Sequence, residues 1–328
     1  MRKFIVKRLL LSVVILFCVT FIIYLIMRCL PGSFVESRAM QLATAPGAKP
    51  YEEWLAQLNA MYGLDKPIVI GYFGWLKDFF SGNFGDSWKY TVPVLEKFND
   101  TVWLSFIMGA ISFVLELVIA VPLGIIAATR QYSRADYAIS VFALIGISLP
   151  TFFFATLLKL LFSVRLGWFD LVGLVSRNYQ LMTPFQQFWD KAYHLVLPII
   201  TLTIVSIGSL MRYVRTNMLE VLNADYIRTA RAKGLSEKKV IYHHAFRNTL
   251  IPLVTIIGGS LPGLFSGALI TEQLFAIPGI GYASYYAMVI GDIPFSMFYM
   301  TFLAILTLLG NLISDILYAV VDPRVRIA

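Results

Sequence analysis

The side chains that could do chemistry are a few isolated residues and one dense polar segment. The three histidines are His194, His243 and His244, and the last two are adjacent, so they point to different faces of a helix. A metal site needs several ligands that converge on one point, which this spacing does not supply. Cys18 and Cys29 lie eleven residues apart, which is about 16 Å along a helix and too far for a disulfide bond. The sequence therefore predicts no metal site and no disulfide framework.

Nucleotide chemistry is also unexpected in this chain. The sequence has no G-x-x-x-x-G-K-[ST] segment, through which many proteins hold nucleotide phosphates. No Ser/His/Asp or Cys/His set is credible as a catalytic group, since both cysteines fall in or beside the first hydrophobic stretch. We expect no enzyme activity and no cofactor in this chain, so that any energy must come from another subunit.

The polar segment is residues 223–255, NADYIRTARAKGLSEKKVIYHHAFRNTLIPLVT, which we call the knob. Residues 224–233 are good helix formers, and Gly234 is the residue type best suited to a left-handed helix end. Ser236 can cap a second helix, with Glu237 favourably placed at its positive end. The sequence therefore predicts a helix, a glycine turn and a second helix.

Basic residues in and before the knob allow two interpretations. Eight of them lie between positions 212 and 247: Arg212, Arg215, Arg228, Arg231, Lys233, Lys238, Lys239 and Arg247. A basic loop beside a membrane often contacts anionic lipid. The alternative is a rigid helical element that docks onto a cytoplasmic partner.

Composition places the elements around the knob in a membrane. Of the 328 residues, 58% are hydrophobic and only 14% are charged, and the apolar residues fall in long blocks. A helix needs about 20 apolar residues to cross a bilayer core. A net charge of +8 would suggest nucleic acid in a soluble protein, but here it is interpreted by location and no nucleic-acid partner is expected.

Six stretches are expected to span the membrane, namely 9–27, 101–128, 137–164, 194–211, 250–270 and 298–320. A cleaved signal peptide is the alternative for the first, but its apolar core would be shorter, about 7–15 residues. Six spans place both termini on one side, and the excess of Lys and Arg in the intervening loops makes that side cytoplasmic. The chain then divides into a first span (1–30), an extracytoplasmic segment of short amphipathic helices and turns (31–100), and a five-helix core (101–328) with a cytoplasmic loop (212–248).

Two sets of residues within the spans are candidates for the solute pathway or for helix packing. Glu116 lies in the middle of the second span, where an ionisable group is costly and should face protein or water, and we favour a hydrogen bond to a neighbouring helix. Asn311 and Asp315, one turn apart in the last span, are interpreted in the same way. Gly259, Gly263 and Gly267 form a four-residue ladder in the fifth span, and small residues at this spacing allow close helix packing. That packing is either within the chain or beside a pathway shared with a partner.

The knob has a specific resemblance. The run from Asp225 to Leu235, followed by His244, Arg247-Asn248 and Leu250-Ile-Pro252, resembles the coupling loop of binding-protein-dependent ABC importer permeases. The oligopeptide, dipeptide and nickel branch is particularly similar, and the early LPG, GLDKP and GNFGDS stretches resemble it too. The resemblance implies an all-α membrane protein with the type I ABC importer permease fold, as the first of two permeases in a bacterial cytoplasmic membrane.

The resemblance also implies partners and site residues. The partners are a second homologous permease, two ABC ATPase subunits that hold ATP and Mg²⁺, an extracytoplasmic substrate-binding protein and membrane lipid. The residues expected to contact an ATPase are Asp225, Tyr226, Arg228, Ala230, Arg231, Lys233, Gly234 and Leu235. The implied substrates are oligopeptides or dipeptides, and nickel chelates, glutathione or another small solute are alternatives.

Proteins of other classes are also considered. A secondary transporter or channel should show inverted repeats or a charge relay, but the sequence has no obvious matching pair of broken helices. A scaffold that recruits a partner through a basic loop would not need Glu116 or kinked, glycine-bearing spans. An importer permease is therefore the favoured interpretation.

Overall fold

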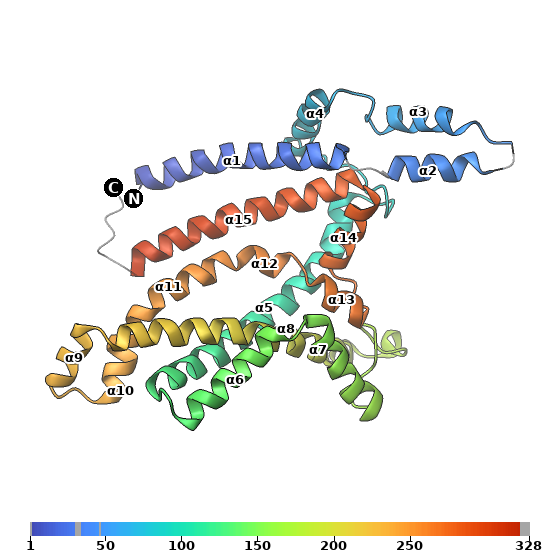
Figure 1. The fold of residues 1–328 in the computed structure, drawn as a ribbon. Helices are drawn as coiled ribbons and strands as arrows, with labels where there is room; N and C mark the ends of the chain where they lie inside the picture. The colour runs from blue at the N-terminus through green and yellow to red at the C-terminus, as the bar shows by residue number, and fades with distance from the viewer. Residues whose placement is uncertain (1, 30–33, 46, 322–328) are drawn as a thin grey trace.

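The computed structural model describes residues 2–29, 34–45 and 47–321, and helices dominate this part of the chain (Figure 1). The long helices are α1 (Arg2–Cys29), α5 (Val94–Thr129), α8 (Pro184–Leu222) and α15 (Ile293–Val321). The shorter ones are α2 (Phe34–Ala43), α3 (Tyr51–Met61), α4 (Ile68–Phe80), α6 (Arg134–Ser148), α7 (Thr151–Leu158), η1 (Lys159–Arg165), η2 (Tyr179–Leu181), α9 (Asp225–Ala232), α10 (Glu237–Lys239), η3 (Val240–Ala245), α11 (Phe246–Gly259), α12 (Leu261–Phe265), α13 (Leu269–Phe275) and α14 (Ile280–Ile290).

Four of the described helices are long and apolar enough to cross a membrane alone, and two bent pairs raise the number to six. The third and fifth expected spans are the two bent pairs. The third is α6 followed by α7 and η1, at 104° to each other. Proline disfavours a helical conformation in the residue before it, and Leu149, just before Pro150, is extended (ψ 124°). The fifth bends by 47° at Pro252, where the helix loses a backbone hydrogen bond.

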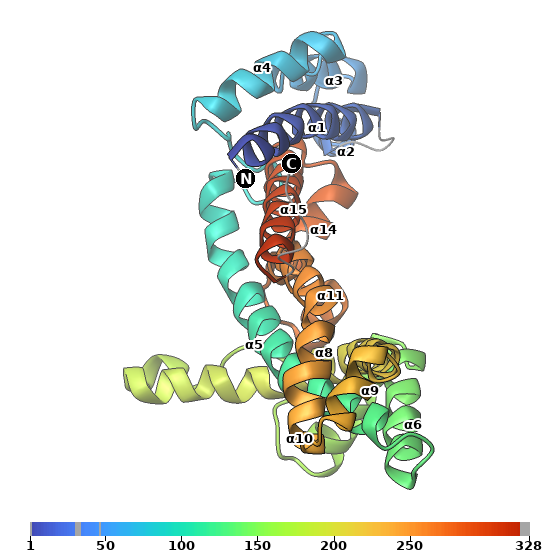
Figure 2. The same ribbon diagram turned by 90° about the vertical axis from the view of Figure 1, so that its left-hand side faces the viewer.

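Residues 34–45 and 47–93 form short helices and turns of the kind predicted for residues 31–100, whereas residues 94–100 belong to α5. α2 and α3 extend as a pair away from the other helices, and α4 lies against α1 (Figures 1 and 2). The α1–α4 contact centres on Tyr72, which is fully buried among aromatic side chains of α1. Its hydroxyl lies 2.9 Å from Oγ1 of Thr20, so this helix is fixed to the first span by both packing and a buried hydrogen bond.

The core is built around α8. Its start is fixed by a capping box, in which Thr183 and Gln186 each accept a hydrogen bond from the other's backbone N–H. Small residues then let its neighbours approach closely, since a side chain at Gly208 would collide with the backbone of α6. One hydrophobic cluster joins α5, α6, α8, α9, η3 and α11, so the knob and the spans share a core.

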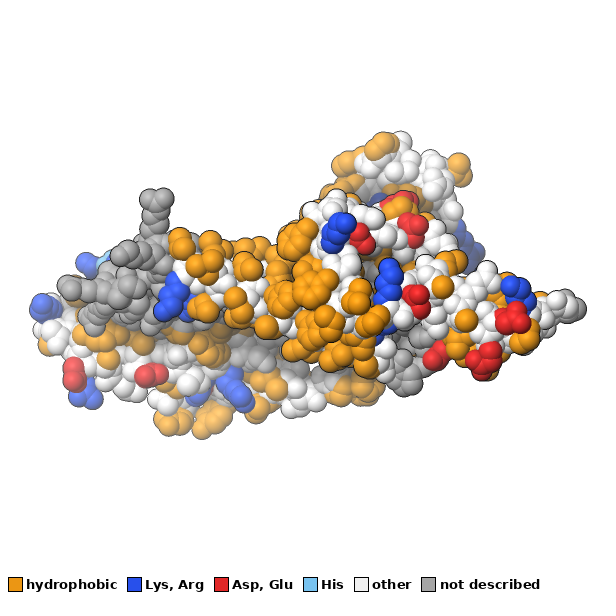
Figure 3. All heavy atoms as spheres, turned by 90° about the horizontal axis from the view of Figure 1, so that it is seen from above, with side chains coloured by type: hydrophobic (Ala, Val, Ile, Leu, Met, Phe, Trp, Pro, Cys, Tyr) orange, Lys and Arg blue, Asp and Glu red, His pale blue; other side chains and the backbone are white. Residues whose placement is uncertain are grey.

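The surface agrees with a membrane location. Figure 3 shows hydrophobic side chains along the middle of one face, with charged side chains gathered toward its two ends. Large apolar side chains such as Val14, Val118 and Phe152 are more than half exposed. In a bilayer, this surface contacts lipid or neighbouring subunits rather than water.

Candidate functional site

The knob has the helix, turn and helix order that its sequence predicts. α8 continues to Leu222, beyond the expected end of its span at residue 211, and α9 follows it at one end of the molecule (Figure 1). Gly234 follows with φ +76°, the left-handed conformation expected of it. Ser236 has the backbone of a helix cap, but its side chain accepts no capping hydrogen bond, which corrects that prediction.

α9 has one buried and one exposed face. Ile227 and Ala230, three residues apart, are 0% and 7% exposed and pack in the cluster that contains Val240 and Ala245. The remaining charged or aromatic candidates for ATPase contact are exposed: Asp225, Tyr226, Arg228, Arg231 and Lys233. Ala230 lies instead on the face that fixes the helix to the core, and its expected role toward the ATPase stays a prediction. Leu235 is half-buried against the same cluster.

The basic residues of the knob region do not form one open patch. Arg215 makes two hydrogen bonds to the carboxylate of Asp136, at 2.8 and 2.9 Å, and so joins α8 to the start of α6. Arg231 bonds Glu237 across the glycine turn at 2.9 Å. Arg228 lies 3.6 Å from Asp225 on the exposed face of α9. Carboxylates therefore accompany three of the eight basic residues, and the exposed face of α9 carries both signs of charge.

The four pathway candidates line one cavity. Glu116, Gly259, Gly263 and Gly267 border a space of about 310 Å³ between α5, α8 and the α11–α12 segment. Four serines also line it, Ser105, Ser112, Ser206 and Ser260. Glu116 makes no hydrogen bond or ion pair with a described residue, so the expected bond to a neighbouring helix is absent from this part of the chain. Its half-buried carboxylate borders the cavity instead.

The glycine ladder does not act as one packing face within this chain. A Cβ atom at Gly259 or Gly263 would meet no atom within 4 Å, whereas Gly267, beyond α12 with φ +73°, lies closely against the backbone of Gly281. The close approach occurs one residue earlier, where a side chain at Gly258 would collide with Ser314 of α15. Gly259 and Gly263 therefore border the cavity instead of packing against α15.

Glu272 organises the loop beyond the fifth span, a role that the sequence reasoning missed. It is completely buried. Its Oε1 accepts hydrogen bonds from Ser105 Oγ (2.7 Å) and the Ala268 N–H (2.9 Å), and its Oε2 accepts one from the Tyr282 N–H (2.8 Å). A carboxylate that accepts three donors is well satisfied in a buried site. The adjacent Pro-Gly-x-Gly turn was the available signal, because glycines give the backbone room beside a buried side chain.

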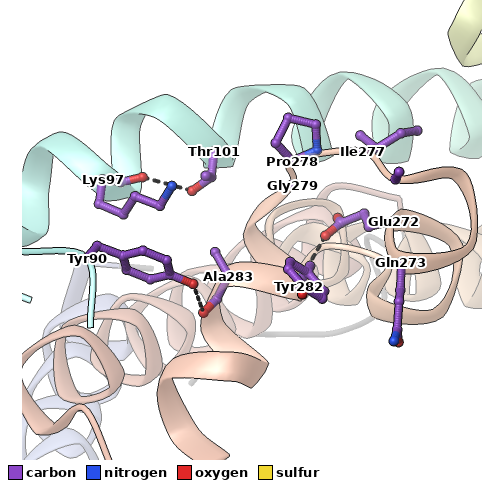
Figure 4. A pocket seen from close by; sticks show the side chains of 11 residues that line it. Tyr90, Lys97, Thr101, Glu272, Gln273, Ile277, Pro278, Gly279, Tyr282 and Ala283 are labelled. Atoms are coloured by element: carbon purple, nitrogen blue, oxygen red, sulfur yellow. Dashed lines mark hydrogen bonds between the residues drawn. The ribbon is translucent and has the colours of Figure 1, made fainter. Parts of the chain in front are cut away.

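Figure 4 shows the cavity beside this loop, whose volume is about 360 Å³. The Glu272 carboxylate bonds Tyr282 along one wall, and the Tyr90 hydroxyl donates a 3.0 Å hydrogen bond to the Ala283 carbonyl along another. The Lys97 ammonium lies 4.5 Å from the centre of the Tyr90 ring. Burial, chiefly, raises the pKa of Tyr90 to about 12, so its hydroxyl stays protonated and able to donate at neutral pH.

Asp292 ties residues 87–89 to the start of the last span and was also missed. It is fully buried and accepts hydrogen bonds from Ser87 Oγ, the Lys89 N–H (3.0 Å) and the Phe295 N–H (3.2 Å). Burial raises the pKa of this carboxyl.

At the other end of the last span, Asp315 pairs with Arg8 of α1 at 3.1 Å. Asp315 thus has a structural partner, as interpreted from the sequence.

The histidines lie in separate environments. His194 is buried in α8, with Nε2 3.0 Å from Asp170 and Nδ1 2.7 Å from the carbonyl of Asp190. His243 and His244 are in η3, and their rings are nearly perpendicular. Within the described residues, no group of three His, Cys, Asp or Glu side chains could hold a metal ion.

The fold and the site define a membrane protein with several spans and an exposed helical knob, and comparison with known proteins identifies its family. The family described as "Binding-protein-dependent transport system inner membrane component" matches residues 120–327, and the N-terminal part of such components matches residues 1–99. The chain belongs to this family and is a permease subunit of an ABC importer, with ATP hydrolysis residing in separate subunits. It is an integral inner-membrane protein.

Individual relatives agree with this assignment. The chain is 37% identical to the oligopeptide transport system permease protein AppB of Bacillus subtilis, over 99% of this chain and all of that protein. It is 34% identical to the oligopeptide transport system permease protein OppB of Haemophilus influenzae, again over 99% and 100%. Among solved structures, the inward-facing MetNI methionine ABC transporter matches 70% of this chain and 97% of its own, with a TM-score of 0.54 and 19% identity. That likeness supports the fold.

Proposed function

We propose that this chain forms half of the translocation pathway of an ATP-driven importer of oligopeptides or dipeptides. The other half is a second homologous permease, the substrate arrives on an extracytoplasmic binding protein, and two ABC ATPases supply the energy from ATP and Mg²⁺. Full-length relatives named as oligopeptide permeases support the peptide substrate. No feature of the described residues favours a nickel chelate or glutathione over a peptide.

The exposed face of α9 is the observation that carries this proposal. Its buried side, Ile227 and Ala230, fixes the helix rigidly to the shared core. Its exposed side combines Tyr226 with charges of both signs, Asp225 and Arg228. Anionic lipid attracts clustered positive charge, whereas a face with both signs and an aromatic side chain suits a protein groove. This supports ATPase docking over lipid contact.

The same geometry suggests how movement at the knob reaches the membrane. α9 packs on η3, and η3 continues directly into α11. α11 ends at Gly259, which lines the Glu116 cavity. A displacement of α9 by closing ATPases would therefore move the wall of that cavity through packed helices, because close-packed interiors transmit displacement. ATP binding would open the pathway to the binding protein, and hydrolysis would reset it.

Gly234→Val tests docking without removing a charge. The glycine has φ +76°, and a Cβ there would meet no atom within 4 Å, so the substitution acts through backbone strain alone. A β-branched residue in this conformation costs at least about 1–2 kcal/mol, whereas asparagine tolerates it. We expect Gly234→Val to insert and assemble in membranes but to lose peptide uptake, and Gly234→Asn to retain uptake. Equal uptake by the two variants would contradict the proposal.

Crosslinking tests which face of α9 meets the ATPase. Cysteines at Tyr226 and Thr229 are on the exposed side, and a cysteine at Ala230 is on the buried side. With Cys18 and Cys29 replaced by serine, the first two should crosslink to co-expressed ATPase in membranes and the third should not. Failure at both exposed positions would remove the basis for docking.

The proposed orientation places both termini in the cytoplasm. It is tested by reporter fusions after four positions, two in each direction. Fusions after Arg134 and Lys239 should report a cytoplasmic location, and fusions after Gly85 and Tyr282 an external one. An external report at Lys239 would place the knob on the wrong side for any ATPase.

A further inference from the structure

The Glu116 cavity has the composition of a binding site rather than of a packing defect. Glu116 is the only ionisable side chain among the residues that line it. Four serine side chains and three glycines, Gly259, Gly263 and Gly267, form much of the wall. A Cβ atom at Gly259 or Gly263 would meet only open space. Its volume of about 310 Å³ falls in the range of small-molecule sites, roughly 300–1,000 Å³.

Comparison with the buried Glu272 shows that Glu116 differs from a structural carboxylate. Glu272 accepts three hydrogen bonds from neighbouring donors and is fully enclosed. Glu116 accepts none from a described residue and borders the cavity. A carboxylate inside a membrane span is costly unless it pairs with an opposite charge or contacts water. The described residues therefore supply no positive charge beside Glu116, and a cationic ligand would provide one.

We propose that Glu116 binds the positively charged amino group of a peptide as it passes through this cavity. The inference rests on the proposed peptide-import function. An ammonium group has three N–H donors, which the carboxylate can share with serine hydroxyls of the cavity wall. A metal ion fits less well, because no three metal-ligating side chains gather here among the described residues. The site would favour substrates with a free amino terminus at the permease, after delivery.

A test of the charge uses the full importer complex in membranes, with Cys18 and Cys29 replaced by serine. Ser206 is exposed and lines the cavity, so Ser206→Cys provides a thiol there. The probes are the cationic aminoethyl and the anionic sulfonatoethyl methanethiosulfonates. One unit of negative charge nearby should favour the cationic reagent, and Glu116→Gln should lower the ratio of the two rates by about ten-fold. Ser81→Cys, exposed at the end of α4 and outside the cavity, is the control whose ratio should not change.

A test of recognition uses protection of the same thiol. Trialanine should slow labelling of Ser206→Cys by a neutral maleimide, and N-acetyl-trialanine, which lacks the ammonium group, should protect several-fold less. Glu116→Gln should abolish this difference, and Glu116→Asp should retain it. Because Glu116→Asp keeps the charge, loss of the difference in both variants would indicate altered folding of the cavity and refute a charge-specific role.

The outcomes separate this inference from the importer function. Equal protection by the two peptides, an unchanged rate ratio in Glu116→Gln, or a complete lack of labelling at Ser206→Cys would each overturn amine recognition. None of these measurements requires transport, so they can succeed or fail independently of the Gly234→Val uptake experiment. Loss of uptake in Gly234→Val with equal protection by both peptides would leave the importer function supported and this inference rejected.

Discussion

The close contact between Gly279 and Glu272 makes a quantitative prediction. Gly279 has an ordinary backbone conformation (φ −91°, ψ 171°) that alanine also adopts. A Cβ atom there would lie closer than 3.0 Å to the carboxylate of Glu272, nearer than real Cβ atoms approach. Gly279→Ala must therefore push the buried carboxylate aside and break at least one of its three hydrogen bonds.

The expected cost follows from those bonds. A hydrogen bond to a buried charged group contributes about 1.5–3 kcal/mol, so Gly279→Ala should destabilise the permease by about 2–5 kcal/mol. A shift of about 2–4 °C in melting temperature accompanies each kcal/mol in domains of 150–250 residues. We expect the purified complex in detergent to melt about 4–20 °C lower, as followed by fluorescence-detected size exclusion after heating.

Two further variants show whether the collision is the cause. Gly74→Ala, in α4, is the matched control, since a Cβ there would meet nothing within 4 Å; it should leave the melting temperature unchanged or slightly higher, because alanine favours a helix. Glu272→Asp shortens the carboxylate side chain, so its combination with Gly279→Ala should cost less than the sum of the single changes. Equal melting temperatures for Gly279→Ala and Gly74→Ala would refute the reasoning.

Two other predictions concern helix contacts and the cavity. Asp136→Ala and Arg215→Ala should each destabilise the complex by about 2–4 kcal/mol and the double variant by clearly less than their sum, because either single change leaves a charge without its partner; additive effects in thermal denaturation would contradict the pair. Gly263→Leu should fill the cavity and reduce peptide uptake with little loss of stability, whereas Gly258→Leu should lower the melting temperature because its side chain collides with Ser314. Normal uptake in Gly263→Leu would place the cavity outside the pathway.

Much of the knob was predictable because local rules govern it. Helix propensity over residues 224–233, a glycine at position 234 and the following polar residues determine a helix, a left-handed turn and a second helix. The residue order in the knob also resembles the family motif, and the comparisons confirm the family over the full length of the chain. Hydrophobic block length likewise predicted six spans, because bilayer thickness sets the length of an apolar helix.

The distant pairings were decided by tertiary structure alone. Asp136 and Arg215 are 79 residues apart, Ser105 and Glu272 are 167 apart, and Ser87 and Asp292 are 205 apart. Periodicity relates residues within a few turns of one helix and carries no information on such partners.

The positions of the two helix bends were predictable from the sequence, but their angles depended on the tertiary structure. Pro150 and Pro252 indicate where a span is interrupted, because proline removes a backbone donor, but the angles of 104° and 47° depend on how the flanking helices pack. That packing turns Gly259 and Gly263 away from the neighbouring helix and toward Glu116. The sequence alone therefore predicted a membrane permease and the helix, glycine turn and helix of its knob. Only the tertiary structure decided that its isolated glutamate and its glycines border the same cavity, because helix bends redirect whole faces of side chains.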